Sequence, residues 1–243
     1  MRVSGPPLNP IRTDAPVRYL LTHLDTAWAL TLIHLRLALI PVLLGLLIAV
    51  PLGALVWRHP TLRRITTVIA SVIFTIPSLA LFVVLPLTIP TRILDETNVI
   101  VALTLYTTAL LVRAVPEALD AVPAPVRDAA TAVGYGRIGQ LLKVELPLSI
   151  PVLTAGLRVV AVTNISMVAV GSVIGIGGLG VWFTEGYQAD KSDQIVAGII
   201  AVFVLAIVVD VLILLAGRFL SPWARVQTGQ RPRATALKAE AAS

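Results

Sequence analysis

The chain of 243 residues contains no cysteine and few charged or aromatic side chains. Without cysteine, neither disulfides nor thiolate metal sites can form, and the three histidines, His23, His34 and His59, are too scattered to suggest a metal cluster. Charged residues make up 13% and aromatic residues 5% of the chain, whereas 57% of the residues are hydrophobic. This composition, with a mean hydropathy of +0.91, is far from that of soluble globular proteins and predicts a polytopic membrane protein.

Two sequence patterns of enzymes are also missing. Neither G-x-x-x-x-G-K-[ST] nor a Gly-Lys dipeptide occurs, so the chain cannot hold ATP through a P-loop of its own. No G-x-S-x-G pattern of a nucleophile elbow occurs either. Gly175, Gly177 and Gly180 match the dinucleotide fingerprint G-x-G-x-x-G, but they follow a membrane segment and lack the βαβ context that this fingerprint needs. We therefore expect a chain that is not an enzyme and binds no cofactor itself.

Uncharged runs long enough to cross about 30 Å of hydrocarbon predict five membrane-spanning helices. The fourth of them contains Arg158 and the fifth contains Asp210. Prolines interrupt the runs, which membrane helices tolerate when their neighbours satisfy the freed backbone groups. The predicted spans are about 37–57, within 65–90, about 97–112, about 148–174 and 195–217.

These spans divide the chain into three parts. Residues 1–36 form an N-terminal tail, whose segment 17–36 mixes apolar and polar residues as an interfacial helix does. Residues 37–217 form one membrane domain. Residues 218–243, rich in proline, arginine and alanine, are expected to be a disordered tail.

The positive charges set the orientation of the chain. One side of the predicted membrane collects twelve Lys and Arg residues, in the first and third loops and the C-terminal tail, and the other side has six. The more positive side is cytoplasmic. The N-terminus is thus expected outside and the C-terminus inside. The pI near 10.3 comes from basic residues at the ends of the spans and does not indicate a nucleic-acid partner.

The cytoplasmic loop before the fourth span is polar and helix-patterned. Pro125 suits the first position of a helix, and Asp128 is then expected in the first turn, where the helix dipole favours a carboxylate. Gly134 can adopt the left-handed conformation that ends a helix. A second short helix, about 137–144, is expected to stop before Pro147, because proline disfavours helical geometry in the residue before it.

This loop resembles the EAA motif of ABC-transporter importer permeases. The motif begins with an acidic residue and two alanines, followed after three residues by a glycine. After nine further residues comes an aliphatic residue, then one further residue and Leu-Pro. The matching residues are Asp128, Ala129, Ala130, Gly134, Val144, Leu146 and Pro147, with Asp for the usual Glu and Val for the usual Ile.

The resemblance implies an all-α integral membrane fold, a five-span type I ABC importer permease core with a cytoplasmic coupling helix. It also implies the partners: two ABC ATPase subunits that bind ATP and Mg, a second permease copy or a related permease, and an extracytoplasmic solute-binding protein. The location it implies is the bacterial cytoplasmic (inner) membrane.

Three further stretches, TIPSLAL (75–81), IGIGGLG (174–180) and AGIIAVFVLAIVVDVLI (197–213), resemble the permeases for glycine betaine, carnitine, choline and related osmoprotectants. The implied function is the import of such a solute. Permeases for methionine and phosphonates share the layout, so another small solute stays an alternative. An ion-coupled secondary carrier is a further alternative, but it predicts inverted repeats or several acidic residues at mid-membrane.

Two more groups of residues are candidate sites. We expect Gly175, Gly177, Gly178 and Gly180 to form a tight turn near the outer mouth of the pathway, where small residues let backbones pack closely. The aromatic residues that follow could attract a quaternary ammonium group or form an interfacial belt; they are Trp182, Phe183 and Tyr187.

The two charges inside the spans lie at similar depths from the cytoplasmic side. Arg158 and Asp210 are both about 12 to 15 Å deep at a rise of about 1.5 Å per residue, so they can form an ion pair within the helix bundle. In the alternative, Asp210 faces the pathway and meets a cationic solute.

Overall fold

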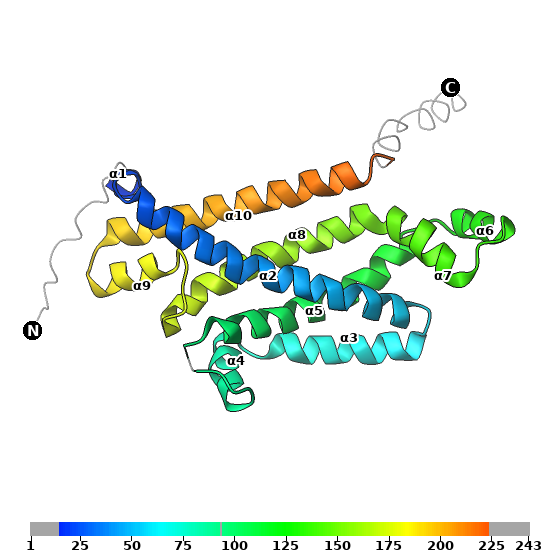
Figure 1. The fold of residues 1–243 in the computed structure, drawn as a ribbon, viewed down its shortest axis with the longest axis horizontal. Helices are drawn as coiled ribbons and strands as arrows, with labels where there is room; N and C mark the ends of the chain where they lie inside the picture. The colour runs from blue at the N-terminus through cyan, green and yellow to red at the C-terminus, as the bar shows by residue number, and fades with distance from the viewer. Residues whose placement is uncertain (1–14, 93, 224–243) are drawn as a thin grey trace, which may run out of the picture. The chain divides into compact units, whose positions relative to one another are not determined.

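The structure, a computed structural model, describes residues 15–92 and 94–223. Every regular element in these residues is helical (Figure 1). The helices are α1 (Ala15–Thr22), α2 (Leu24–Trp57), α3 (Pro60–Thr75), α4 (Ser78–Val84), α5 (Glu96–Asp120), α6 (Ala124–Ala132), α7 (Arg137–Gln140), α8 (Leu146–Gly171), α9 (Val181–Gln188) and α10 (Ser192–Leu220). Three short segments of other helix types complete the list. They are the 3₁₀ turns η1 (Leu85–Leu87) and η3 (Ser172–Ile174) and the π-helical turn η2 (Leu141–Glu145). The all-α prediction is confirmed.

The described residues form two compact units, each built from parts of the long helices. Unit 1 comprises residues 15–45, 75–92, 94–107 and 161–208. Unit 2 comprises residues 46–74, 108–160 and 209–223. Each unit buries its own apolar core, with Leu37, Leu103 and Ile165 fully buried in unit 1 and Leu111, Val115 and Leu119 in unit 2.

Among the residues that the structure describes, four helices are long and apolar enough to cross a membrane, and a broken pair of helices supplies a fifth candidate. The third predicted span is longer than expected, because α5 continues past Arg113 to Asp120. The first span starts earlier than residue 37, because α2 begins at Leu24. The predicted boundary at residue 36 therefore lies inside a continuous helix, and α1 is the only separate helix in the N-terminal segment that the structure describes.

The second predicted span is broken and not continuous. α3 ends at Thr75, α4 begins at Ser78, and the chain bends by 86° at this break. Pro77 precedes α4 with extended backbone (φ −61°, ψ 131°), whereas Pro41 and Pro51 lie inside an unbroken α2. The hydroxyl of Tyr106 donates a hydrogen bond to the carbonyl of Ile76, so the break leaves this backbone acceptor satisfied.

A side-chain cap starts α5 after the α4–α5 loop. The carboxylate of Asp95 accepts a hydrogen bond from the backbone N–H of Thr97 at 2.8 Å, which is the usual arrangement of a helix N-cap. The side-chain and backbone hydrogen bonds from Thr97 lower the pKa of Asp95. Asn98, which is fully buried, holds the loop through a bond to the carbonyl of Arg92.

The helix before the fourth span does not stop at Pro147, so that prediction is wrong. α7 passes through the π-helical turn η2 directly into α8, and the apolar candidate span covers Arg137–Ile174. The N–H of Leu146 reaches back five residues to the carbonyl of Leu141. Pro147, which has no N–H to donate, is the second residue of α8.

Candidate coupling loop and membrane sites

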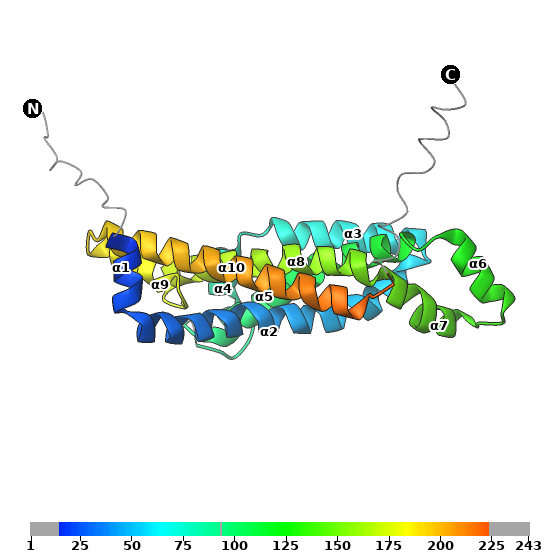
Figure 2. The ribbon, with the colours of Figure 1, turned by 90° about the horizontal axis from the view of Figure 1, so that it is seen from above.

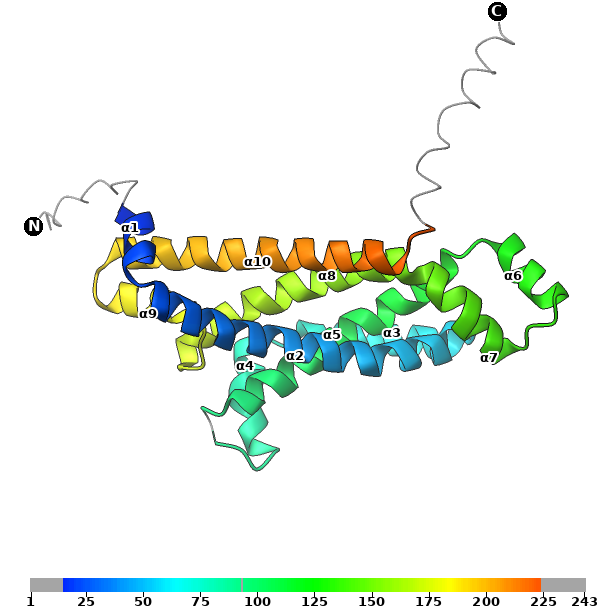
Figure 3. The same ribbon diagram turned by 45° about the horizontal axis from the view of Figure 1, so that its top comes forward.

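The helix α6 carries the first half of the motif and lies in unit 2, as do α7 and η2. Figure 3 shows α6 and α7 joined by a short loop. α6 begins after Pro123, so Pro125 lies in its first turn. Asp128 is the fifth residue of α6 and not in the first turn, which holds no acidic residue. The expected stabilisation of Asp128 by the helix dipole therefore does not apply, because that effect is confined to the first turn.

The C-terminus of α6 is closed by Gly134. Its φ of +94° is the left-handed conformation, and its N–H donates to the carbonyl of Thr131 at 3.0 Å. The N–H of Tyr135 donates to the carbonyl of Ala130 at 3.1 Å. These two bonds form a Schellman motif, which is the helix ending expected where glycine follows an alanine-rich helix.

α6 has an inner and an outer face. Ala130 is buried and Arg127, three residues before it, is half-buried, so these two residues share the inner face. The outer face exposes Asp128, Ala129 and Ala132. Because alanine side chains are short, a partner protein can approach this face of the helix closely.

Apolar side chains that follow α6 are also exposed. Val133 is 79% and Ile138 74% exposed, and Leu142 is 57% exposed. The second half of the motif differs, because Val144, Leu146 and Pro147 are half-buried. α6 contacts both α7 and η2, so the two halves of the motif lie together.

A buried carboxylate inside the motif was missed by sequence reasoning. Glu145 lies in η2 between two motif residues and is fully buried. Nη2 of Arg58, just after the end of α2, donates to both oxygens of Glu145, at 3.1 and 3.3 Å. A buried carboxylate is costly unless it is paired, so Arg58 allows Glu145 to stay inside the protein. Because the pairing joins residues 87 positions apart, no local pattern signals it.

Arg158 and Asp210 form the predicted ion pair inside unit 2. Nε of Arg158 donates to Oδ1 of Asp210 at 2.7 Å, and Nη2 donates to Oδ2 at 2.6 Å. This two-pronged geometry is the strongest form of an arginine–carboxylate pair. It joins α8 to α10, which also pack closely where Thr154 occupies the space that a Cβ on Gly217 would need.

The glycine-rich turn lies in unit 1 and is held tightly. Gly175 has a φ of +80°, and a Cβ on Gly180 would lie 2.4 Å from the carbonyl oxygen of Ala169. A Cβ on Gly178 would lie within 2.9 Å of three atoms of His34, one of them in the backbone. The turn thus has the close backbone packing that its four glycines suggested, against both α8 and α2.

His34, on α2, is fully buried and joins the turn to the helices of unit 1. Its Nδ1 accepts a hydrogen bond from the N–H of Leu179 at 3.2 Å. The remaining ring nitrogen, Nε2, lies 2.9 Å from the carbonyl oxygen of Ile165 on α8, so it carries the proton and donates. His34 is therefore a neutral tether, a role that the isolated histidine in the sequence did not reveal.

The three aromatic residues after the turn do not converge. Trp182, on α9, is buried and packs edge-on against Tyr19 of α1, with ring centroids 5.5 Å apart. Figure 2 shows α1 and α9 at the same end of the ribbon. Tyr187 is 81% exposed. Burial raises the pKa of Tyr19, and the carboxylate of Glu185 raises it further. The described residues thus form no cage from these three side chains.

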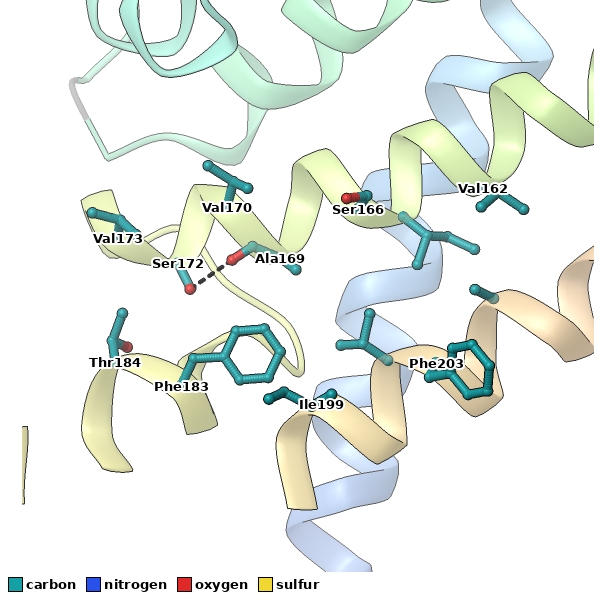
Figure 4. A pocket seen from close by; sticks show the side chains of 13 residues that line it. Val162, Ser166, Ala169, Val170, Ser172, Val173, Phe183, Thr184, Ile199 and Phe203 are labelled. Carbon is teal, nitrogen blue, oxygen red and sulfur yellow. Dashed lines mark hydrogen bonds between the residues drawn. The ribbon is translucent and has the colours of Figure 1, made fainter. Parts of the chain in front are cut away.

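The third aromatic residue, Phe183, lines an apolar cavity of about 510 Å³ in unit 1. Figure 4 shows residues of α8 on one side of this cavity and Phe183, Ile199 and Phe203 on the other. The polar groups in the lining are hydroxyls. Ser172 and Thr184 donate theirs to backbone carbonyls at 2.7 and 3.0 Å, which leaves Ser166 as a polar contact for any occupant.

A comparison with known protein families decides the class of the chain. Residues 41–226 match the model of the family described as binding-protein-dependent transport system inner membrane component. The chain belongs to this family. It is therefore a multi-pass inner-membrane component of a transport system that depends on a binding protein, and the matched residues include the whole loop from α6 to α8.

Individual relatives and solved structures agree with the family. The osmoprotectant import permease protein OsmW of Salmonella typhimurium is 34% identical over 80% of this chain and 91% of its own length. The choline transport system permease protein OpuBB of Bacillus subtilis is 33% identical over 78% of this chain and 86% of its own. Among solved structures, this chain is similar to a chain of the inward-facing MetNI methionine ABC transporter. The two superpose with a TM-score of 0.67 and are 25% identical, over 84% of this chain and 96% of the MetNI chain. The fold is thus that of an ABC importer permease.

Proposed function

We propose that the chain is the membrane-spanning subunit of an ATP-driven importer, and that the surface formed by α6, α7 and the Gly134 turn contacts its ATPase subunits. The observation that carries the proposal is the exposure of this surface. Val133 and Ile138 expose more than 70% of their area, next to the open alanine face of α6. Large apolar groups that are exposed together on the turn after α6 and on the first residues of the next helix indicate a protein partner.

The proposal extends to the partners and to the orientation of the chain. Two ATPase subunits bind ATP and Mg, because this chain has no P-loop and no ATPase site of its own. The excess of positive charge on the loop side puts α6 and the C-terminus in the cytoplasm and the N-terminus outside. A second permease copy or a related permease encloses the pathway with this chain. An extracytoplasmic binding protein delivers the solute, as the family description implies.

The solute we propose is an osmoprotectant such as glycine betaine, choline or carnitine. Curated relatives with 30 to 34% identity are named for these solutes. The methionine transporter chains are 25 and 27% identical. The higher identity to osmoprotectant permeases over most of the chain favours their substrate class over an amino acid.

Uptake by the reconstituted transporter tests the solute. The chain is purified with its ATPase, placed in ATP-loaded vesicles and supplied with the binding protein encoded beside it. We expect uptake of labelled glycine betaine, choline or carnitine, and no uptake of methionine. If methionine is taken up and the three osmoprotectants are not, the proposed solute is wrong and the transporter imports an amino acid.

Co-purification of an ATPase tests the contact surface. A tagged wild-type chain in detergent is expected to carry an ATPase subunit whose hydrolysis the solute-loaded binding protein stimulates. Asp128→Lys, on the exposed face of α6, is expected to reduce that stimulation strongly while the chain still folds. If no ATPase accompanies the wild type, or if Asp128→Lys leaves the stimulation unchanged, the contact is wrongly placed.

A further inference from the structure

Trp57, the last residue of α2, joins three helix ends in unit 2. Its indole N–H donates to Oδ1 of Asp120, the last residue of α5, at 2.6 Å. The other oxygen of Asp120 accepts from Nη1 of Arg63, in the first turn of α3, at 2.7 Å. Both oxygens of one carboxylate are thus used to hold α2, α3 and α5 together.

Two guanidinium groups also lie over the ring of Trp57. The guanidinium carbon of Arg58 is 5.0 Å from the ring centroid, and that of Arg127 is 5.8 Å from it. Both distances are within the range in which a cation is attracted to an aromatic face. Arg127 belongs to α6 and directly precedes Asp128 of the motif, so this contact connects α6 to the end of α2.

The two arginines connect Trp57 to two parts of the coupling loop, α6 and η2. Arg127 is on α6, and its carbonyl accepts a bond from the amide of Gln140 on α7 at 3.2 Å. Arg58 pairs with the buried Glu145 of η2. Trp57 is therefore in contact with Arg127, which belongs to α6, and with Arg58, which is paired with η2. Its own N–H is bound to Asp120 at the end of α5.

We propose that Trp57 is a positioning residue for coupling. It holds the inner face of α6 against the ends of α2, α3 and α5, so that a displacement of α6 moves these helix ends and is not absorbed by the loop. This inference rests on the proposed function, in which α6 contacts the ATPase. The outer face of α6 stays free for that contact, because Trp57 engages the opposite face through Arg127.

Paired variants separate this role from general stability. Arg127→Gln removes one of the two cations over the Trp57 ring, the one that belongs to α6, and Arg127→Lys keeps a cation at this position. Trp57→Leu removes both the ring and its N–H, whereas Trp57→Phe keeps a ring and loses only the bond to Asp120. Arg64→Gln, an exposed arginine of α3 outside this set of contacts, is the matched control for loss of one positive charge.

The experiment uses the complete transporter in vesicles, with this chain, its ATPase and its binding protein. Three quantities are measured for each variant: the amount of co-purified ATPase, solute-stimulated ATP hydrolysis, and solute taken up per ATP hydrolysed. We expect Arg127→Gln to retain the ATPase but to lower uptake per ATP about two- to five-fold, the change that loss of an exposed cation–π contact corresponds to. Arg127→Lys is expected to restore most of the uptake, and Arg64→Gln to match the wild type.

The results distinguish the inference from the proposed function. If the wild-type chain carries no ATPase, the proposed function fails. If the ATPase binds and Arg127→Gln leaves uptake per ATP unchanged, Trp57 has no positioning role. If Arg127→Gln instead loses the bound ATPase, Arg127 is a docking residue and the inference is again wrong. Should Trp57→Leu fail to fold, the two Arg127 variants still decide, since Arg127 is on a short helix outside the spans.

Discussion

The fully buried polar side chains described in unit 1 are neutral, whereas unit 2 also buries a carboxylate, Glu145, beside the neutral Gln140, Ser149 and Ser221. In unit 1, His34 bonds to the backbone of α8 and of the glycine turn, and Asn164 donates to the carbonyl of Ala38 and the hydroxyl of Thr107. In unit 2, the buried Glu145 is paired with Arg58. The partly buried Arg158 and Asp210 pair with each other.

This difference fits what each unit has to do. A neutral group with fixed hydrogen bonds holds helices in one arrangement, since breaking it leaves a donor or acceptor unpaired. Ion pairs join elements over longer side chains and depend on both partners. Unit 2 contains α6 and the ends of the helices that α6 is proposed to move, and its connections include three ion pairs. Four sets of substitutions test this comparison, from the largest expected effect to the smallest.

Breaking the ion pair of unit 2 is expected to have the largest effect. Arg158→Leu or Asp210→Leu alone leaves one charge without its partner inside the helix bundle, so most of the folded protein should be lost from the membrane. The double variant removes both charges and is expected to recover much of the yield, because no unpaired charge remains. Yield is measured by size-exclusion chromatography in detergent. A double variant that is worse than both single variants would contradict the pairing.

The close packing of unit 1 gives the second effect. Gly180→Ala places a Cβ 2.4 Å from the carbonyl oxygen of Ala169, and overpacking of this kind costs about 1–3 kcal/mol. Gly175→Asn is the control, because a Cβ there would lie at an ordinary contact distance of 3.8 Å from Cδ2 of Leu94 and asparagine tolerates the positive φ. We expect a clear drop in melting temperature for Gly180→Ala only. Equal melting temperatures for the two variants would show that the turn can move away from α8.

The neutral tether of unit 1 gives the third effect. His34→Ala leaves the buried N–H of Leu179 without its acceptor, at a cost of about 1–3 kcal/mol. His59→Ala, at an exposed histidine in the α2–α3 loop, should be neutral. Melting curves of both variants at the same pH decide the matter, and a wild-type curve for His34→Ala would mean that another group takes over both hydrogen bonds.

The smallest effect is expected in the coupling loop, where the backbone conformation and not packing is decisive. Gly134 and Gly136 both have open space where a Cβ would be, but only Gly134 has a positive φ. Gly134→Ala should therefore cost about 1–2 kcal/mol locally, with reduced ATPase stimulation and little change in melting temperature. Gly136→Ala should match the wild type in both measurements. Equal stimulation in the two variants would show that the left-handed turn is unnecessary for coupling.

Local sequence patterns predicted the helices, the loop and its glycine ending, because each depends on residues close together in the chain. The depth of Arg158 and Asp210 also predicted their pairing. The effect of proline was harder to predict. Pro41 and Pro51 leave α2 unbroken, and Pro77 breaks its span where Tyr106 can bond the freed carbonyl of Ile76. Whether a proline breaks a helix thus depends on neighbours that are distant in sequence.

Other features came only from tertiary contacts. A π turn carries the helix through Pro147, and no periodicity in the loop indicates it. His34 and Glu145 are single polar residues in apolar or mixed segments, and their partners lie 131 and 87 positions away. The cluster around Trp57 likewise joins residues that are separated by more than 60 positions at the bond to Asp120.

Site-directed crosslinking tests the central claim, that α6 meets the ATPase, most directly. Because the chain has no cysteine, Ala132→Cys introduces a single thiol on the exposed face of α6. A maleimide reagent with a photoreactive arm is attached there and irradiated in native membranes. Tyr187→Cys, on the exposed surface of α9, is the control. We predict a crosslink from position 132 to a protein with a P-loop, and none from position 187. Crosslinking of that protein from position 187 alone would contradict the proposed coupling surface.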